Sequence, residues 1–513
     1  MTRFINTIEE ISLRRAVFLA AGWIFLRIFF EGVLEAGHRI GYTSFSYTML
    51  LTYFVHFPLF YICLFLLLVL LISTITREKI ERVTGAASAG LGSLLLVPLI
   101  DWFLHRGYLI TYPVRAGPYL TGFLDPFTDL SRIGVSPGQR ITIFLIAALT
   151  GIYGYYKKRS ILRALALFAA SLAVIVLFGG LTTILSGNQP ENVFITGGIL
   201  FTDTQKYGAL YTVLFAAIVF IYLSRLETGH TRATLRAARP ERMIFYGAMA
   251  VFGLGVSVAN AGISFTPGVF NHLGVVMIFL SMVFGFWCLQ GFNDIFDTGI
   301  DRIGGRNNPL LSGVPAWYHN SFCILLAALA LCGALVVNFS AFLIMTAYLL
   351  LGVVYSMPPV RLKRVPVIAT MTIAVAVCLS MGFGYSVYHG GRALNAIPGR
   401  ILYPTLIAVT LGFTAKDIGH AAADRAGGVL TLPVLFYDRQ KIRGRVPIAL
   451  LISLSYLVYA LFLPPVLPGA AICAASTLLY TLLVKETRES FYFAMLFLFG
   501  GYLFYTLLTI LPL

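Results

Sequence analysis

The sequence predicts an all-α polytopic membrane protein with about fifteen transmembrane helices. Three observations support this fold class. Hydrophobic residues make up 58% of the 513 residues and charged residues only 11%, whereas soluble globular domains are usually about one quarter charged. The mean hydropathy is +0.86. The apolar runs are also long enough for membrane helices, each of which needs about 20 residues to cross a bilayer.

Fifteen apolar segments account for most of the chain. Their centres lie near residues 25, 60, 94, 148, 174, 216, 252, 281, 329, 348, 377, 407, 455, 474 and 500. The first segment is followed by further spans, so we expect a retained membrane helix and not a cleaved signal. It contains Arg27 and Glu31. Because these residues are four positions apart on one helix, they can form an ion pair within the membrane.

The basic residues indicate how the helices cross the membrane. The formal net charge is +16, and lysines and arginines gather in alternate short loops. Cytoplasmic loops carry such an excess of positive charge. The opposite short loops near residues 266, 338 and 465 contain no lysine or arginine. The pattern predicts a multi-pass protein of the cell membrane with its N-terminus inside and its C-terminus outside. Its basic loops would face anionic membrane lipids, so we expect no nucleic-acid partner.

A polar stretch, LSRLETGHTRATLRAARPERM at residues 223–243, separates two groups of spans. We expect a membrane domain of about six helices over residues 1–240 and a second domain of about nine helices over residues 241–513. In the first domain, Asp101, His105 and Arg106 end the third span near the outer face. They are consistent with an outward-facing lipid or partner site, although a scaffold or oligomerisation module with paired charges is the interpretation we favour.

The segment GFNDIFDTGIDRIGGRNNPLLSG, residues 291–313, places three carboxylates where the eighth span ends. Asp294 and Asp297 are three residues apart, and Asp301 follows four residues later. If the helix continues, all three lie on one face together with Asn293. Three like charges repel one another unless a cation is bound. Carboxylate oxygens that also face substrate phosphates are typical ligands of Mg²⁺.

A second acidic segment, TAKDIGHAAADRAGGVLTLPVLF at residues 414–436, ends the twelfth span on the same side of the membrane. Asp417 and Asp424 are seven residues apart, which is two helical turns, and His420 would lie between them on the same face. Lys416 precedes the first aspartate. We therefore expect the two acid-bearing helix ends to share one site. The alternative is that these acids are solvated and paired with neighbouring basic residues.

A third segment, LLGVVYSMPPVRLKRVP at residues 350–366, ends the tenth span on that side. The two consecutive prolines are expected to end the helix. Arg361 and Lys363 then offer positive charge to a phosphate or to lipid headgroups. Tyr355 and Ser356 would lie just inside the mouth of the site. The alternative interpretation is that the basic residues only anchor the chain at the membrane interface.

Together the three segments resemble the UbiA superfamily of intramembrane prenyltransferases. The family motif NDxxDxxxD is matched by Asn293, Asp294, Asp297 and Asp301, and a PLxSG sequence follows it at residues 309–313. The second motif, DxxDxxxD, is matched by Asp417 and Asp424, and the YSxPPxxLK element is matched by residues 355–363. The resemblance covers about residues 241–513. The sequence departs from the family where His420 replaces the middle aspartate, and where Gly305 and Asn308 replace common basic residues.

The resemblance implies a nine-helix bundle that binds a prenyl diphosphate. It implies that Mg²⁺ is held, through the diphosphate, by five catalytic aspartates: Asp294, Asp297, Asp301, Asp417 and Asp424. Substrate binding would involve Asn293, Arg302, Arg306, Tyr355, Ser356, Arg361, Lys363, Lys416 and His420. In the implied reaction the allylic C–O bond ionises and pyrophosphate leaves. An acceptor, which the sequence does not identify, then attacks the carbocation in a cavity that excludes water.

Two other functions are open at this stage. A transporter or flippase would use acids to bind ions, but such acids usually lie in the middle of discontinuous helices in repeated halves. Here the acids end spans on one membrane face. A catalytically reduced scaffold of the same fold is the second alternative, since His420 replaces an aspartate and imidazole is a poor partner for Mg²⁺.

Overall fold

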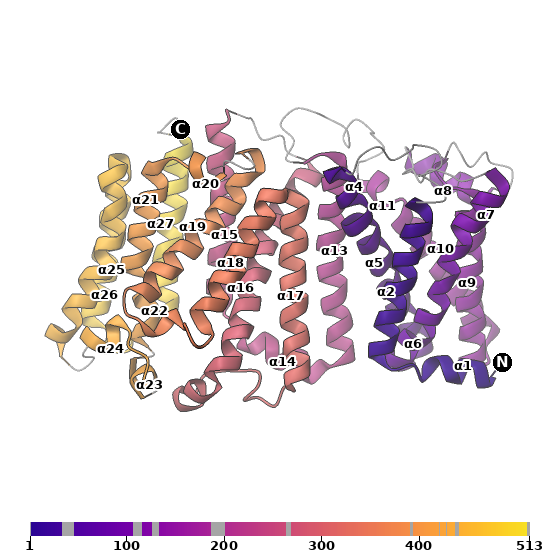
Figure 1. Cartoon of the computed structure of the whole chain (residues 1–513), viewed down its shortest axis with the longest axis horizontal. Helices are drawn as coiled ribbons and strands as arrows, with labels where there is room; N and C mark the ends of the chain where they lie inside the picture. The colour runs from indigo at the N-terminus through magenta and orange to yellow at the C-terminus, as the bar shows by residue number, and fades with distance from the viewer. Residues whose placement is uncertain are drawn as a thin grey trace. The chain divides into compact units, whose positions relative to one another are not determined.

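We describe the fold from a computed structural model of the chain (Figure 1). The described residues are 2–32, 46–105, 115–125, 133–185, 201–262, 268–389, 393–419, 421–426, 428–436 and 441–509. They form α-helices with short 3₁₀- and π-helical segments, and no strand occurs among them. The predicted all-α fold class is therefore confirmed.

Thirteen helices within the described residues are long and apolar enough to cross a membrane. They are Tyr47–Thr76, Ile80–Leu104, Ile161–Gly179, Thr204–Leu226, Pro240–Asn260, Val269–Gly304, Ala316–Val337, Phe339–Ser356, Ile368–His389, Gly399–Ile418, Ile442–Phe462, Pro464–Leu483 and Glu489–Thr509. The chain is therefore an integral multi-pass membrane protein. Every predicted centre lies in a helical segment. The two further helices at predicted centres, α2 (Leu13–Phe30) and α9 (Pro137–Lys158), each carry three basic residues and are not among the thirteen.

The chain divides into two compact units. The first comprises residues 1–228 and 267–274, and the second comprises residues 229–266 and 275–513. Residue 240, where the sequence analysis placed the domain boundary, begins α15 and lies inside the second unit. The division into domains over residues 1–240 and 241–513 stays a prediction.

The first unit contains a series of α-helices and two short segments of other helix types, the π-helix η2 and the 3₁₀-helix η3. Their bounds are α1 Thr2–Glu9, α2 Leu13–Phe30, α4 Tyr47–Leu51, η2 Thr52–His56, α5 Phe57–Thr76, α6 Ile80–Gly90, η3 Leu91–Leu95, α7 Leu96–His105, α8 Ala116–Leu124, α9 Pro137–Lys158, α10 Ile161–Gly179, α11 Leu181–Leu185 and α13 Asp203–Leu226. Asp101 on α7 accepts hydrogen bonds from Ser136 Oγ (2.5 Å) and from the backbone N–H of Gly138 (2.7 Å). It therefore stabilises the N-terminus of α9, which agrees with the scaffold interpretation of this position. Arg106 lies outside the described residues, and the side chain of His105 is not described.

The predicted ion pair of the first span is present. Arg27 Nη1 lies 3.1 Å from Glu31 Oε2, and both side chains are buried. Breaking a buried pair on one side leaves an uncompensated charge. We expect Glu31→Leu to lower the free energy of unfolding by about 3–5 kcal/mol, and Arg27→Met/Glu31→Leu to recover most of that loss. Thermal unfolding of the purified variants in detergent checks this, and a double variant less stable than Glu31→Leu would contradict it.

The remaining helices lie mainly in the second unit, although α16 begins within residues 267–274 of the first. Their bounds are α15 Pro240–Asn260, α16 Val269–Gly304, α17 Ala316–Val337, α18 Phe339–Ser356, η5 Leu362–Arg364, α19 Ile368–His389, α20 Ala393–Ala396, α21 Gly399–Gly412, α22 Ala415–Ile418, α23 Ala421–Ala426, α24 Leu432–Phe436, α25 Ile442–Phe462, η7 Pro464–Val466, α26 Leu467–Leu483 and α27 Glu489–Thr509. A short helix, α14 (Thr228–Ala237), precedes them. The short helices α22, α23 and α24 lie at one end of the bundle that the long helices form (Figure 1).

Glycines allow α15 and α19 to pack with their backbones in contact. A Cβ atom on Gly253 of α15 would lie 1.9 Å from the carbonyl oxygen of Met381, and one on Gly384 of α19 would lie 1.8 Å from that of Ala250. No larger residue fits at either position without moving a helix, because the colliding atoms are backbone atoms. Small residues commonly permit such close helix contacts in membranes. This contact fixes α15 and α19, both of which contribute side chains to the site described next.

Candidate active site

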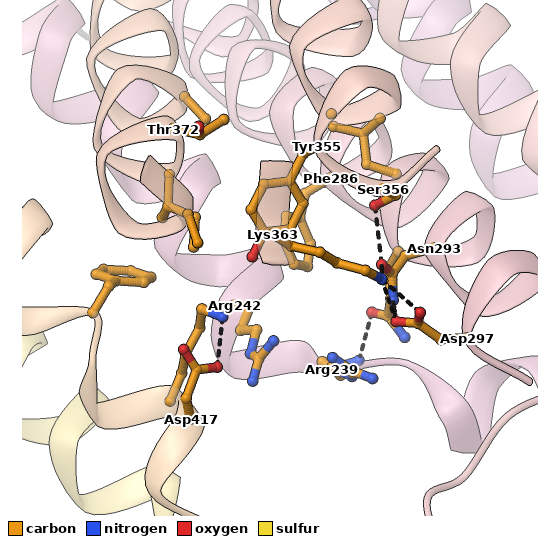
Figure 2. A pocket seen from close by; sticks show the side chains of 18 of the residues that line it. Arg239, Arg242, Phe286, Asn293, Asp297, Tyr355, Ser356, Lys363, Thr372 and Asp417 are labelled. Carbon is orange, nitrogen blue, oxygen red and sulfur yellow. Dashed lines mark hydrogen bonds and ion pairs between the residues drawn. The ribbon is translucent and has the colours of Figure 1, made fainter. Parts of the chain in front are cut away.

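The polar ends of α16 and α18, the start of α15 and the short helix α22 meet at one cavity in the second unit (Figure 2). The empty space of the cavity, part of which is open to solvent, amounts to about 1210 Å³. Nine residues that the sequence analysis proposed line it: Asn293, Asp297, Arg306, Tyr355, Ser356, Lys363, Lys416, Asp417 and Asp424. The two acidic segments, far apart in the sequence, therefore face a common space.

The first acidic segment is helical along its whole length. Because α16 continues to Gly304, Asp294, Asp297 and Asp301 share one helix, as the spacing predicted. All three side chains are buried, with 1%, 6% and 1% of their surfaces exposed. A buried carboxylate needs hydrogen bonds or a nearby cation to remain ionised. The contacts of each aspartate therefore indicate what this helix end can bind.

Asp297 is held by two cations and an amide. Lys363 Nζ lies 2.6 Å from Oδ1 and 2.5 Å from Oδ2, and Arg361 Nη2 donates to Oδ1 at 2.7 Å. Asn293 Nδ2 donates to Oδ2 at 2.8 Å. Figure 2 shows Lys363 reaching across to Asn293 and Asp297, with Asp417 and Arg242 on the other side of the cavity. In this state Lys363 and Arg361 neutralise Asp297, and both are suited to bind a phosphate instead.

The end of α18 is fixed to α16 through Asn293. Its Oδ1 accepts hydrogen bonds from Ser356 Oγ (2.9 Å) and Lys363 Nζ (2.7 Å). These two donors identify that atom as the oxygen, so the amide nitrogen points toward Asp297. The helix ends at Ser356, and only Met357 separates it from the consecutive prolines that the sequence predicted to end it. Asn293 and Ser356 therefore position Lys363 and Asp297.

Arg306 connects the two acidic segments. Its Nη1 lies 3.5 Å from Asp301 Oδ1, and its Nη2 lies 3.4 Å from Asp424 Oδ1. The chain reverses at Gly305, whose φ is +62°, and the N–H of Arg306 donates to the carbonyl oxygen of Asp301. This is the geometry of a glycine-terminated helix. A glycine at residue 305 thus allows the following arginine to turn back toward the acids.

The side chain of Asn308 forms hydrogen bonds to the acidic end of α16. It is fully buried, and its Nδ2 donates to the carbonyl oxygen of Asp294 and to Asp301 Oδ2, both at 2.9 Å. Oδ1 of Asp294 is buried without a hydrogen-bond partner among the described residues, whereas the buried Oδ1 of Asp301 has the ionic contact to Arg306 described above. Neither aspartate lines the main cavity. Carboxylate oxygens such as these are nevertheless of the kind that suits a hard cation.

The second acidic segment forms two short helices and not the predicted continuous helix. Asp417 lies in α22, which ends at Ile418, and Asp424 lies in α23, which begins at Ala421. Gly419 lies between them, and glycine is a weak helix former. The expectation of one shared helical face is therefore wrong, although both aspartates line the cavity. His420 lies outside the described residues.

Burial shifts the pKa values of two groups that line the cavity. It raises the pKa of Asp424 to about 6, an effect that Asp417 reinforces and Arg306 opposes. Burial also lowers the pKa of Lys363 to about 8, while Asp297 acts in the opposite direction. Shifts of this kind are common at functional sites. The charges of Asp424 and Lys363 therefore depend on which other charged groups are bound in the site.

Comparison with known proteins identifies the family. The model of the UbiA prenyltransferase family matches residues 252–508. The chain belongs to this family. The resemblance inferred from the three sequence segments is thus confirmed.

Three relatives illustrate the extent of the similarity. The chain is 30% identical over 224 residues to homogentisate solanesyltransferase of Arabidopsis thaliana, covering 40% of this chain and 56% of that protein. It is 28% identical over 208 residues to digeranylgeranylglyceryl phosphate synthase of Pyrococcus horikoshii, covering 40% and 69%. A UbiA homologue from Archaeoglobus fulgidus, solved with GPP and Mg²⁺, is 18% identical with a TM-score of 0.39, covering 54% of this chain and 100% of that chain. The chain spans about half the length of the first curated relatives it matches.

Two of the basic residues proposed from the UbiA resemblance differ in position from the rest. Arg302 is exposed and is not among the residues that line the cavity. Arg361 does not line the cavity either, but it contacts Asp297 directly. The remaining cations, Lys363, Lys416 and Arg306, line the space together with the acids.

Sequence reasoning missed two arginines of this UbiA site. Arg239 and Arg242 line the cavity (Figure 2), although the sequence analysis treated them as charges of a polar linker. Arg242 forms two hydrogen bonds to Glu489 of α27, at 2.7 and 2.9 Å. Burial lowers the pKa of Arg239, which also lies near the charge of Arg242. Arg239 and Arg242 are three residues apart at the start of a helix, so they lie on one side of that helix. This spacing is the sequence signal that could have identified them.

Proposed function

We propose that this chain transfers a prenyl group from a prenyl diphosphate to an acceptor within the membrane, with Mg²⁺, and releases pyrophosphate. The observation that carries the proposal is a single cavity that is lined by aspartates from two segments, several cations and a set of apolar side chains. Membership of the UbiA family supports it. So do the names of the curated relatives, which include homogentisate and phloroglucinol prenyltransferases.

The cavity suits the two halves of a prenyl diphosphate. Five cations, from α15, the turn after α16, the loop after α18 and α22, would face the diphosphate: Arg239, Arg242, Arg306, Lys363 and Lys416. Leu289, Leu351, Ile373 and Ala376 provide an apolar wall for the chain. An apolar wall also excludes water, which would otherwise react with an allylic carbocation. Binding of the diphosphate would draw Lys363 away from Asp297.

The acids at the cavity fit a metal that shares its ligands with the substrate. Among the described residues no group of three or more acidic, histidine or cysteine side chains is arranged to hold an ion by itself. Mg²⁺ typically binds through one or two carboxylates together with substrate phosphates and water. Asp297, Asp417 and Asp424 line the cavity, and Oδ1 of Asp294 is buried without a hydrogen-bond partner among the described residues. When bound, Mg²⁺ would neutralise charge on the departing pyrophosphate.

The alternation of basic and neutral loops supports a cytoplasmic active site. Under this proposal the chain lies in the cell membrane with its N-terminus inside and its C-terminus outside. The acids of the site lie at helix ends around one cavity, and not in the middle of repeated discontinuous helices. This favours the enzyme over a transporter or flippase.

Pyrophosphate release tests the proposal directly. Purified protein in lipid nanodiscs would be mixed with prenyl diphosphates of several chain lengths, with Mg²⁺ or with EDTA, in the presence of a membrane lipid extract that supplies acceptors. We expect pyrophosphate release that requires Mg²⁺, together with a new prenylated product seen by mass spectrometry. Failure to release pyrophosphate from every donor would overturn the proposal and favour a scaffold or transporter.

Lowering the pH below about 6 should raise the Mg²⁺ concentration that pyrophosphate release requires. The ionised carboxylate of Asp424 binds a cation and its acid form does not, and its pKa is raised to about 6. The Mg²⁺ concentration that gives half-maximal pyrophosphate release should therefore rise by up to about tenfold per pH unit below that value. An Asp424→Asn variant should lose most of this dependence. A half-maximal concentration that stays constant from pH 7 to pH 5 in the parent would contradict the prediction.

A further inference from the structure

A small cavity beside α16 has no role in the function proposed so far. Residues of α14, α16 and α17 line it, and they include Asp294, His319 and Cys323. The room inside it is about that of one water molecule. All of its lining residues belong to the second unit. A site here would therefore be formed by the same unit as the candidate active site.

The ring of His319 provides one hydrogen-bond acceptor in this cavity. Its Nε2 donates to the carbonyl oxygen of Gly291 at 2.8 Å. A carbonyl oxygen can only accept, so Nε2 carries the hydrogen, and Nδ1 of the neutral ring is then an acceptor. Nδ1 is buried without a hydrogen-bond partner among the described residues. The imidazole can therefore accept one further hydrogen bond.

Asp294 provides a second acceptor. It follows Gly291 by three residues on α16, and it lines the small cavity but not the larger one. Asp294 and His319 are both 1% exposed, and Oδ1 of Asp294 is the second buried atom without a partner. Two acceptors cannot bond to each other, and burying an acceptor without a donor is unfavourable. The pair therefore calls for a small molecule that donates two hydrogen bonds.

Arg239 connects this cavity to the candidate active site. Gln290 lines both cavities, and its Oε1 accepts a hydrogen bond from the backbone N–H of Arg239 at 3.2 Å. Burial lowers the pKa of Arg239, whereas the charge of Asp294 raises it. Arg239 itself lines the larger cavity. Whatever holds Asp294 in its ionised form therefore also supports a cation that would face the diphosphate.

We propose that the small cavity binds one ordered water molecule that donates hydrogen bonds to His319 Nδ1 and Asp294 Oδ1, and that His319 is thereby a positioning residue for the diphosphate site. The positioning role rests on the proposed function, whereas the water site does not. Buried waters typically satisfy polar groups of this kind. The water would stabilise the ionised carboxylate, which in turn supports the positive charge of Arg239. Oδ1 of Asp294 would then be occupied by the water and not by Mg²⁺.

An experimental structure of the parent in lipid nanodiscs, at a resolution that shows ordered waters, tests the site itself. We expect density for one water within about 3.2 Å of both His319 Nδ1 and Asp294 Oδ1. A direct hydrogen bond between the two side chains, a cavity without density, or a metal ion at about 2.0–2.2 Å from them would overturn the proposal. The density is observed without turnover, so it decides the water site even if the proposed function fails.

Two substitutions of His319 test the positioning role. His319→Gln keeps a nitrogen donor at the ε position for the carbonyl oxygen of Gly291 but has no acceptor at the δ position, whereas His319→Asn has an oxygen there. His319→Gln should raise the KM for the prenyl diphosphate by about tenfold and change kcat by less than about twofold. His319→Asn should recover most of that loss. The control is Asn320→Leu, because Asn320 is the exposed neighbour of His319 on α17.

Thermal unfolding of the same variants separates positioning from a purely structural role. A structural role would lower kcat in proportion to the loss of folded protein and leave KM at the parental value, and that result would overturn the proposal. An equal rise in KM for His319→Asn and His319→Gln would also overturn it, because the acceptor at the δ position would then be irrelevant. Pyrophosphate release by the parent, measured separately, reports whether the proposed function fails.

Discussion

Replacing Asp297 with asparagine should lower kcat/KM for prenyl transfer by about 10²- to 10³-fold. The carboxylate accepts four hydrogen bonds, three of them from Lys363 and Arg361. Asparagine has nearly the same shape but no charge, so it would leave two cations uncompensated in the empty site. It would also remove a ligand for Mg²⁺ from the cavity. Steady-state pyrophosphate release from a prenyl diphosphate measures the effect.

A matched acid on the surface provides the control for Asp297→Asn. Glu241 is exposed at the start of α15, so Glu241→Gln should change kcat/KM by less than about twofold. Thermal unfolding of both variants separates a loss of catalysis from a loss of folded protein. If Asp297→Asn retained parental activity while remaining folded, the role given to the first acidic segment would be wrong.

Replacing Lys363 with methionine should lower kcat/KM by about 10²-fold. The ammonium group is buried between Asn293 and both oxygens of Asp297, and burial already lowers its pKa to about 8. Methionine keeps an apolar stem of similar length but removes the positive charge. The loss should appear mainly as a higher KM for the prenyl diphosphate, because the lysine would bind the diphosphate in substrate and transition state alike.

The control for Lys363→Met is Lys441→Met, since Lys441 is exposed at the start of α25. Raising the Mg²⁺ concentration should not restore the activity of Lys363→Met if the lysine contacts the diphosphate itself. Full recovery with added Mg²⁺ would show instead that Lys363 acts only by shaping the metal site.

The first half of the site could be predicted because its residues lie on one regular helix. Asn293, Asp297 and Asp301 follow helical spacing, and α16 continues through all of them. The residues of the second half could be predicted, but their conformation could not. Gly419 interrupts the continuous helix that the spacing of Asp417 and Asp424 implied. The pairing of Arg242 with Glu489 joins α15 to α27, and no local pattern reports a contact between residues so distant in sequence.

Departures from the family pattern acquire physical explanations in the structure. Gly305 supplies the positive φ that lets the chain reverse, so that Arg306 can reach Asp301 and Asp424. Asn308, at a position where the family commonly has a basic residue, replaces a charge with an amide that holds Asp301. Neither role follows from the sequence, since each depends on how the loop folds back against α16.

The most direct test is Mg²⁺-dependent binding of a non-ionising prenyl thiolodiphosphate, because our account requires both acidic segments to act at one site. Dissociation constants would be measured for the parent, Asp297→Asn, Asp417→Asn and the double variant. We predict that binding requires Mg²⁺, that each single variant weakens it by about 10- to 100-fold, and that the double variant binds little worse than either single one. Binding that ignores Mg²⁺, or losses that add fully in the double variant, would contradict a shared site.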